Sequence, residues 1–561
     1  MSSEQLVWLI TGTSSGIGRH LTLAALQRGD KVIATGRSRS FAKLADLQAQ
    51  GADVLELDVT APLESLQEVA KKAVQIHGRI DVLVNNAGSY SSFIYDTSYS
   101  SSTNVFGPLN VNRAFLPYMR ERHSGTVVWI GSLSGWRSAP TMGLYSATKH
   151  AIRALSQTLH TEISPLGLRS ICIEPGAFKT DLLTSDNRAS HGVRIGDYKL
   201  LTEAVEAHLV GLNHNQAGDT NKGVEIIIDV VKGEGCAAGK PFPLILPLGS
   251  DVHGVIKEQA TFAREVHYPY LTMSSQQLVW LITGTSSGLG RCLTLAALKR
   301  GDKVIATGRS QSFSKLEDLK AQGADILELD VTSPPETINE VAKKAIHIYG
   351  RIDVLVNNAG YGEIGPLEEK TSKEAYDQFN THIFGPLNIN QAFLPHMRER
   401  RTGTIVWVGS ICGWICVPTI AMYCATKHAT RALSQALHAE ISPFGLRSTC
   451  IEAGFFQSNI FGAAHHVTSE SRIDDYKELV ATTDAQWEAM NNNLPGDPVK
   501  CAEIIVDVVK GEGTALGKQF PLVLPLGSDA HGGIKEVCEK TIGQLGEWED
   551  VICSTDFPRV A

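Results

Sequence analysis

A tyrosine and a lysine stand four positions apart at two places in the chain: Tyr145 with Lys149, and Tyr423 with Lys427. On a helix, two side chains at this spacing share one face. A neighbouring ammonium group favours the phenolate of a tyrosine, whose ordinary pKa is about 10, and would make it useful for proton transfer at neutral pH. Ser132 and Ser410 precede the tyrosines by thirteen residues. We therefore expect acid–base chemistry beside a carbonyl group that the serine hydroxyl polarises.

Glycine-rich turns precede both pairs. The segments that start at Thr11 and Thr283 each follow an apolar, strand-like run and hold glycines in the order Gly-x-x-x-Gly-x-Gly. Glycine lets the backbone approach a pyrophosphate, and the start of a following helix supplies N–H donors and a partial positive charge. A plain glycine-rich turn remains the alternative. The residues expected to contact a dinucleotide are Gly12, Ser14, Gly16, Ile17 and Gly18, and then Gly284, Ser286, Gly288, Leu289 and Gly290.

The strand after each turn ends in Thr-Gly-Arg, with Arg37 and Arg309 and with no acidic residue in that place. A carboxylate there would repel the 2′-phosphate of NADP, whereas an arginine would attract it. We therefore expect NADP(H) as the cofactor, with NAD(H) less favoured. The alternative is an arginine that only faces solvent.

The chain starts over at Met273. Only three of 27 positions differ between residues 11–37 and residues 283–309, and such similarity at a long period indicates two domains. We place them at residues 1–268, called repeat 1, and 273–550, called repeat 2. A net charge of −8 at pH 7 without a basic cluster argues against nucleic acid or an anionic membrane as a partner.

The start of the chain has no secretory pattern, and no apolar run approaches the ~20 residues of a membrane span, which favours a cytoplasmic protein. The ten cysteines divide unevenly, with two before Met273 and eight after it, so we expect free thiols. Serines stand in repeat 1 where repeat 2 has Cys412, Cys416 and Cys424, and we expect no metal site.

In each repeat, short apolar runs alternate with helical patterns. This predicts a parallel sheet with helices on both faces, and hence two Rossmann-type, doubly wound α/β domains in tandem. The tyrosine of repeat 1 falls on a helix over 145–163, and the serine follows a strand over 126–130. Beyond Gly176 we expect a long polar stretch to about Thr220, and then a helix over 224–231 and a last strand over 242–246.

Three further segments carry expectations. Residues 89–103 are rich in serine and tyrosine and predict a poor or shortened helix, whereas repeat 2 has a good helical pattern from Pro366. The linker over 258–272 has no strong pattern. The tail after Leu545 has no counterpart in repeat 1 and is expected to be loosely ordered.

Taken together, these motifs make both repeats resemble the short-chain dehydrogenase/reductase family over nearly the whole chain. More of that family's motifs follow in order: Asp58-Val59, Asn85-Asn86-Ala87-Gly88 and Pro175-Gly176 in repeat 1, and Asp330-Val331, Asn357 to Gly360 and Gly454 in repeat 2. The resemblance implies hydride transfer between a nicotinamide cofactor and an alcohol or carbonyl carbon. It implies that Tyr145 and Tyr423 act as acid/base. Lys149 and Lys427 would hold the nicotinamide ribose, and Ser132 and Ser410 would orient the substrate oxygen.

The same resemblance implies a set of cofactor contacts. Asp58 and Asp330, with Val59 and Val331, would meet the adenine, and Asn86, Gly88, Asn358 and Gly360 would line the cofactor cleft, with Gly176 and Gly454 in the loop over the nicotinamide. Asp58 also has a plain interpretation as a strand-end cap. Family members use an asparagine to support a proton-relay water beside the lysine. Asn104 matches it in repeat 1, whereas repeat 2 has His382.

The resulting hypothesis is an NADP(H)-dependent oxidoreductase that acts on a small or medium alcohol or ketone. One alternative is a two-site epimerase that oxidises and then reduces a carbinol, and another is a nucleotide-binding scaffold with one or both repeats inactive. Residues 177–218 and 455–496 would cover the substrate and are among the least similar parts of the two repeats. Because family members dimerise through the tyrosine-bearing helix, the two repeats could form an intrachain pseudo-dimer. Further oligomerisation stays open.

Overall fold

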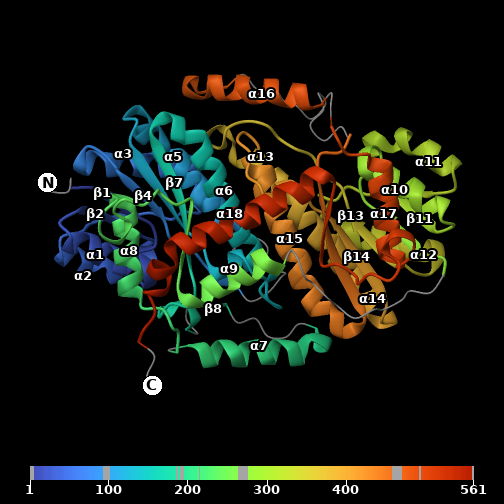
Figure 1. Ribbon diagram of the computed structural model, residues 1–561, viewed down its shortest axis with the longest axis horizontal. Helices are drawn as coiled ribbons and strands as arrows, with labels where there is room; N and C mark the ends of the chain where they lie inside the picture. The colour runs from blue at the N-terminus through green and yellow to red at the C-terminus, as the bar shows by residue number, and fades with distance from the viewer. Residues whose placement is uncertain are drawn as a thin grey trace.

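The computed structural model describes residues 5–91, 101–184, 188–189, 195–213, 215–262, 276–457, 471–491 and 494–558. Two parallel sheets of seven strands lie side by side in it (Figure 1). This confirms the prediction of two doubly wound α/β domains. None of the helices in this part of the chain combines the length and the apolar character that a membrane span needs.

The sheet of repeat 1 has the strand order β3-β2-β1-β4-β6-β7-β9. Leu9 of β1 lies opposite Ile33 on one side and Leu83 on the other, so the chain reverses its winding direction between β1 and β4. In such sheets, ligands bind at the carboxyl ends of the strands beside this point. The strands are β1 (Val7–Ile10), β2 (Lys31–Gly36), β3 (Asp53–Glu56), β4 (Val82–Asn85), β6 (Gly125–Ile130), β7 (Leu168–Pro175) and β9 (Ile245–Leu248).

Helices cover both faces of this sheet. Leu66, Val111 and Ile152 bring α3, α5 and α6 onto one face, and Leu21 and Ile227 bring α1 and α8 onto the other. A two-stranded pair, β5 (Tyr90–Ser91) with β8 (Arg188–Ala189), lies apart from the main sheet. The helices are α1 (Gly16–Gln27), α2 (Ala45–Ala49), α3 (Leu63–His77), α5 (Gly107–Glu121), α6 (Gly143–Ile163), α7 (Lys199–Leu212), α8 (Thr220–Lys232) and α9 (Ser250–Phe262).

Repeat 2 has the same topology, β12-β11-β10-β13-β14-β15-β16. Its strands are β10 (Val279–Ile282), β11 (Lys303–Gly308), β12 (Asp325–Glu328), β13 (Val354–Asn357), β14 (Gly403–Val408), β15 (Leu446–Ala453) and β16 (Val523–Leu526). Its helices are α10 (Gly288–Lys299), α11 (Glu317–Ala321), α12 (Pro335–Tyr349), α13 (Ser372–Phe379), α14 (Gly385–Arg400), α15 (Ala421–Ile441), α16 (Lys477–Asn491), α17 (Pro498–Lys510) and α18 (Ser528–Cys553).

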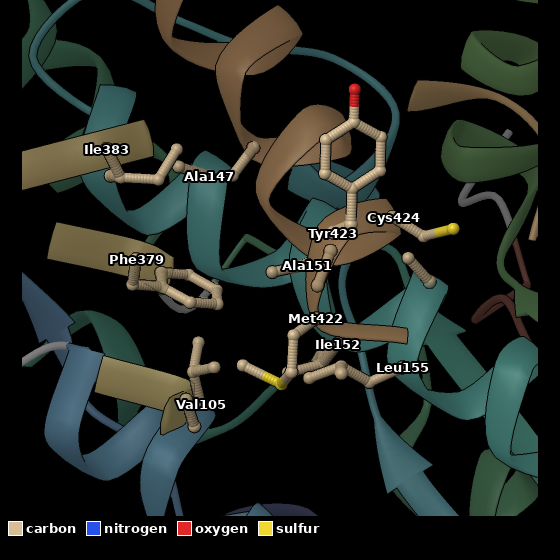
Figure 2. Packing of buried hydrophobic residues seen from close by; sticks show 14 of the residues in the cluster. Val105, Ala147, Ala151, Ile152, Leu155, Phe379, Ile383, Met422, Tyr423 and Cys424 are labelled. Atoms are coloured by element: carbon tan, nitrogen blue, oxygen red, sulfur yellow. The ribbon is translucent and has the colours of Figure 1, made fainter. Parts of the chain in front are cut away.

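The two tyrosine-bearing helices, α6 and α15, pack against each other, and one hydrophobic cluster extends through both repeats. Figure 2 shows part of this cluster, with Val105 and Ile152 of repeat 1 beside Phe379 and Met422 of repeat 2. The hydroxyl of Tyr423 points away from it. The chain therefore contains the expected contact between repeats, and its packing leaves the reactive end of the tyrosine outside the cluster.

The end of the chain differs from the prediction. Helix α18 runs from repeat 2 across the molecule to repeat 1 (Figure 1), and residues 543–558, here called the C-terminal tail, pack on repeat 1. Leu545, Trp548 and Ile552 are buried there, and the Gly249 N–H donates to the carbonyl of Ile552 at 3.0 Å. The prediction of a loosely ordered tail was wrong, because its apolar side chains have a partner surface that belongs to the other repeat.

Three smaller expectations also need correction. The polar stretch before Thr220 contains a helix, α7. The last strand of repeat 1 begins at Ile245 rather than Phe242, since Pro243 cannot donate to a strand ladder. The helical segment after Pro366 is divided: a 3-10 turn, Leu367–Glu369, comes first, and the α-helix begins at Ser372, where Thr371 and Glu374 form a capping box. Residues 92–100, the centre of the predicted poor helix, residues 263–272 of the linker and the first three residues of repeat 2 lie outside the described residues.

Candidate active sites

In each repeat the predicted glycine turn packs tightly against the end of the neighbouring strand. Gly12 has φ of +70°, and a Cβ on it would lie 2.8 Å from the Cα of Ala87. A Cβ on Gly18 would lie 2.3 Å from the side-chain nitrogen of Asn86. Gly284 and Gly290 show the same approaches, to Ala359 and Asn358. Only glycine fits these positions, because any side chain there would collide with the segment that follows the neighbouring strand.

Asn86 ties this turn to the sheet. Its Nδ2 donates to the carbonyls of Thr11 at 2.8 Å and Gly12 at 2.9 Å, and Asn358 does the same in repeat 2 at 2.8 and 3.1 Å. These asparagines therefore hold the shape of the cleft. Their assignment as direct cofactor contacts stays a prediction.

The turn fits a pyrophosphate. Helix α1 begins at Gly16, and its N-cap residue Ser15 makes no side-chain cap hydrogen bond, so the first-turn N–H groups are left for a ligand. Helix α10 begins in the same way after Ser287. Ser14 and Ser286 are half-buried in the two turns. The side chains of Ile17 and Leu289 pack on the core beneath them.

The second strand of each sheet places an arginine at the edge of the cleft. Arg37 is half-buried and Arg309 is exposed. The next residue, Ser38 or Ser310, donates to Glu56 or Glu328 on the neighbouring strand. One acidic side chain therefore stands close to each arginine, a feature that the sequence spacing did not indicate.

Asp58 and Asp330 close turns at the ends of β3 and β12. In repeat 1, Oδ1 of Asp58 accepts from the backbone N–H of Thr60 at 3.0 Å and from its hydroxyl at 2.8 Å. The corresponding distances from Thr332 to Asp330 are 2.9 and 2.7 Å. Val59 and Val331 are buried in the core. The strand-end cap is thus present, and the adenine contact stays a prediction.

The serine, tyrosine and lysine of repeat 1 come together at the end of β6. Ser132 caps a short turn by accepting the Ser134 N–H at 3.1 Å, and its side chain shares a hydrogen bond with Tyr145. The Lys149 Nζ lies 5.7 Å from the centre of the Tyr145 ring and donates to the Ile130 carbonyl at 2.8 Å. Helix α6 carries both residues on one face, as the spacing predicts.

Repeat 2 reproduces this arrangement. Ser410 accepts the Cys412 N–H at 3.1 Å and shares a hydrogen bond with Tyr423, and the Lys427 Nζ lies 5.4 Å from the ring centre of that tyrosine. Lys427 donates to the Val408 carbonyl at 2.8 Å. Both repeats therefore hold a complete serine–tyrosine–lysine set.

The electrostatics of the tyrosines differ from the expectation. Burial raises the pKa of Tyr145, and the hydrogen bond from Ser132 only partly opposes it. Burial also lowers the pKa of Lys149 to about 8, although Cys172 and Glu174 act in the other direction. The lysine donates to a carbonyl, and its charge is not among the causes that shift the pKa of Tyr145. A lowered tyrosine pKa is therefore not a property of the protein alone.

The relay position is occupied differently in the two repeats. The Asn104 Oδ1 accepts the Ser89 N–H at 2.9 Å, and its Nδ2 donates to the Ser89 carbonyl at 3.0 Å and to the Thr148 hydroxyl at 3.2 Å. It sits in a π-helical turn, Ser102–Phe106, of the kind often found at functional sites. One buried amide thus connects the backbone at the end of β4 to the catalytic helix.

In repeat 2, two side chains make the corresponding contacts. The His382 Nε2 accepts the Tyr361 N–H at 3.1 Å, its Nδ1 lies 3.5 Å from the Thr426 hydroxyl, and Gln378 donates to the Tyr361 carbonyl at 2.7 Å. Burial holds the pKa of His382 well below its usual range, and Lys427 lowers it further, so the ring is neutral. The histidine and Gln378 together keep the contacts that Asn104 makes alone.

The loop after β7 is held by an aspartate that lies outside the sequence motifs described above. The Asp251 Oδ2 accepts the Ala177 N–H at 2.7 Å, and a Cβ on Gly176 would collide with this carboxylate. Asp529 plays the same part for Phe455 and Gly454 at 2.6 Å. The signal was available, because each aspartate lies 75 residues after its glycine in both repeats.

The helices that cover the two sites present different side chains. In repeat 1, Leu209 and Val205 of α7 pack with Met142 against Tyr145. In repeat 2, Trp487 of α16 packs against Phe455 with ring centres 6.0 Å apart. Residues 185–187, 190–194 and 458–470 of these covering segments lie outside the described residues. Within the described ranges, no three metal-ligating side chains gather to form a metal site.

Comparison with known proteins gives the same division of the chain. A family model described as short chain dehydrogenase matches residues 6–191 and again residues 278–467. The oxidoreductase BOA17 of Botryotinia fuckeliana is 31% identical over 275 residues, which cover 49% of this chain and 97% of that relative. The uncharacterized oxidoreductase YusZ of Bacillus subtilis is 30% identical, covering 44% and 90%. A solved short-chain dehydrogenase from Streptomyces avermitilis shares 39% identity with a TM-score of 0.44, covering 50% and 98%.

Proposed function

Because the chain belongs to the short chain dehydrogenase family, we propose that it is an NADP(H)-dependent oxidoreductase acting on a small or medium alcohol or ketone. One observation carries the proposal: each repeat places a serine beside a buried tyrosine and lysine, in the same domain as a tight glycine turn at the start of a helix. The relatives BOA17 and YusZ are oxidoreductases by description, which supports the reaction class.

The residues of the chain would divide the chemistry as follows. When bound, the nicotinamide cofactor supplies or accepts the hydride. The Tyr145 Oη passes a proton to or from the substrate oxygen, and the Ser132 hydroxyl donates to the same oxygen and orients it. Lys149 would contact the cofactor ribose and bring a positive charge close to the phenol. This charge would favour the phenolate that burial alone disfavours.

The preference for NADP(H) rests on Arg37 and Arg309. A guanidinium group at the end of the second strand can pair with a 2′-phosphate in a two-pronged arrangement. Glu56 and Glu328 stand close by and would repel the same phosphate, so the preference depends on the arginines outweighing them. We expect Arg37→Glu with Arg309→Glu to weaken NADPH binding at least about tenfold and to leave NADH binding nearly unchanged. Equal losses for both nucleotides in fluorescence titrations would remove the basis for the preference.

The test of the reaction is turnover of a panel of ketones and alcohols with NADPH or NADP+. Tyr145→Phe and Tyr423→Phe are assayed singly and together, and we expect the double variant to lose at least about 100-fold in kcat. Absence of both nucleotide binding and turnover would overturn the proposal. Deuterium entering the carbon without net cofactor consumption would instead indicate the epimerase. Full biological output from the double variant would indicate the nucleotide-binding scaffold.

We also propose that the two sites differ in substrate. The aliphatic side chains of α7 that pack on Tyr145 in repeat 1 suit an aliphatic substituent, and the aromatic pair Trp487 and Phe455 in repeat 2 suits an aromatic substituent. The single tyrosine variants, each with one working site, separate the two preferences. Identical substrate profiles for the two variants would contradict this part of the proposal.

A further inference from the structure

Two buried glutamates cross from one repeat to the other. Glu440, near the end of α15, accepts the backbone N–H of Thr141 at 2.7 Å. Glu162, near the end of α6, accepts the N–H of Thr419 at 2.9 Å and that of Leu367 at 2.8 Å. Each acceptor carboxylate thus belongs to one repeat, and each donor to the other.

The two threonines hold an unusual backbone conformation directly before the catalytic helices. Thr141 has φ of +64° and Thr419 has φ of +67°, in the left-handed region that β-branched residues avoid. Each stands four residues before its catalytic tyrosine. The residue after Thr141 is Met142, which packs on Tyr145. A hydrogen bond that fixes this turn therefore also fixes the start of the helix that carries the tyrosine.

The covering helices are anchored across the repeats as well. Before α7, the turn Gly196–Tyr198 places Asp197 2.5 Å from the Arg398 Nε of repeat 2, and the same guanidinium lies 5.4 Å from the ring centre of Tyr198. The Tyr198 ring also packs edge-on against Phe444 of repeat 2 at 5.2 Å. The cover of the first site thus begins on the surface of the second repeat.

The mirror contact anchors the cover of repeat 2. Arg120 of α5 pairs with Asp475 and with Glu368, and its guanidinium lies 6.0 Å from the ring centre of Tyr476. The Tyr476 hydroxyl donates to Glu368 at 2.7 Å. Arg120 and Arg398 occupy the same place in the two repeats, 278 residues apart. The arrangement is therefore reciprocal.

We propose that each active site is assembled in trans: the loop before the catalytic tyrosine and the start of the covering helix of one repeat are positioned by a glutamate and an arginine of the other. Glu440 and Arg398 are positioning residues for the site of Tyr145, and Glu162 and Arg120 for the site of Tyr423. The consequence for catalysis rests on the proposed oxidoreductase function, whereas the contacts themselves do not.

The chemistry of the glutamates allows a conservative control. Burial raises the pKa of Glu440 to about 8 and that of Glu162 to about 7, although the backbone N–H bonds oppose the shift. What each position must supply is an oxygen that accepts an N–H bond. Glutamine keeps such an oxygen, and alanine does not. A substitution by glutamine should therefore preserve what a substitution by alanine removes.

The catalytic test uses one working site at a time in the full chain. With Tyr423→Phe present, only the first site turns over. We expect Glu440→Ala there to lower kcat at least about tenfold, because small displacements of a catalytic group are costly, and Glu440→Gln to stay within about twofold. Arg398→Ala there should raise KM more than it lowers kcat, since it releases the substrate cover.

The proposal requires that each site depends on positioning residues of the other repeat only. With Tyr145→Phe present, the second site should depend on Glu162 and Arg120 and be nearly indifferent to Glu440→Ala. If Glu440→Ala and Glu162→Ala each lower both sites equally, the contacts only stabilise the interface and the proposal fails. It also fails if Glu440→Gln is as impaired as Glu440→Ala.

A second measurement does not need turnover. We expect Glu440→Ala to speed amide hydrogen exchange at Thr141 at least about tenfold while exchange at Thr419 is unchanged, and Glu162→Ala to do the reverse. Unchanged exchange at both threonines would overturn the proposal even in an active enzyme. If no substrate is turned over but exchange shows the crossed pattern, the proposed reaction fails and the assembly in trans stands.

Discussion

Trp548 is the side chain through which the C-terminal tail meets repeat 1. It is 2% exposed, and it lies in one cluster with Val252 and Ile256 of helix α9. The Lys240 Nζ lies 5.2 Å from its ring centre. The substitution Trp548→Ala removes the largest apolar contact of the tail and leaves its backbone intact.

The size of the effect follows from burial. Replacing a fully buried tryptophan by alanine costs about 3 to 5 kcal/mol. Because the lost contact joins the tail to repeat 1, its loss reduces the free energy that holds the tail on repeat 1. The loss cannot exceed the whole docking free energy, since the tail then detaches. Each ~1.4 kcal/mol is a factor of ten, so the docked state should lose about two to four orders of magnitude in its equilibrium with the open state.

Hydrogen exchange at two amides reports this equilibrium. The Gly249 N–H donates to the Ile552 carbonyl at 3.0 Å, and the Asp219 N–H donates to the Thr555 carbonyl at 2.8 Å. Both should exchange at least about 100-fold faster in Trp548→Ala. Ile542→Ala is the matched control, because that side chain lies on the same helix but is 39% exposed. Unchanged exchange at both amides in Trp548→Ala would refute the docking of the tail on repeat 1.

Three further outcomes test other parts of the structure. Gly18→Ala should weaken nucleotide binding to repeat 1 at least about tenfold, because its Cβ would lie 2.7 Å from a backbone carbonyl. Gly254→Ala, with open space around it, should leave binding unchanged, and equal titration curves for the two variants would contradict the tight turn. His382→Ala leaves the Tyr361 N–H without its acceptor and should lower kcat of the second site about tenfold, whereas His382→Asn should stay closer to the parent. Equal rates for the alanine variant and the parent would show that this hydrogen bond does not support catalysis. Burial raises the pKa of Glu440 to about 8, so the unfolded chain ionises first and stability falls by about 1.4 kcal/mol per pH unit between about pH 4.5 and 8. The stability of Glu440→Gln relative to the parent, measured by urea unfolding, should therefore rise from pH 5 to pH 8, and parallel curves would contradict the shift.

The residues that the sequence located correctly are those whose roles are set locally. A glycine turn between a strand and a helix, or a tyrosine and a lysine one helical turn apart, keeps its geometry whatever surrounds it. Ser132, Tyr145 and Lys149 therefore lie together as predicted. The two sheets follow for the same reason, since apolar runs between helices admit few other arrangements.

What the sequence did not indicate depends on contacts between distant segments. In the sequence, Glu440 is only an acidic residue near the end of a predicted helix. The packing of α15 on α6 brings its carboxylate to the Thr141 N–H. Leu545 and Trp548 read as part of a tail because their apolar partners belong to repeat 1. The raised pKa of Tyr145 likewise comes from burial, which the spacing of residues does not report.

The contact of helix α18 with repeat 1 affects when repeat 1 can complete its fold during synthesis. Gln544 donates to the carbonyl of Ile245, and 299 residues separate the two along the chain. At a synthesis rate of about 5 to 20 residues per second, repeat 1 leaves the ribosome about 15 to 60 seconds before the segment that covers the edge of its sheet. Strand β9 therefore stays uncovered by helix α18 until residues 543–558 have been translated. A premature stop near residue 540 would first damage the repeat that was made first.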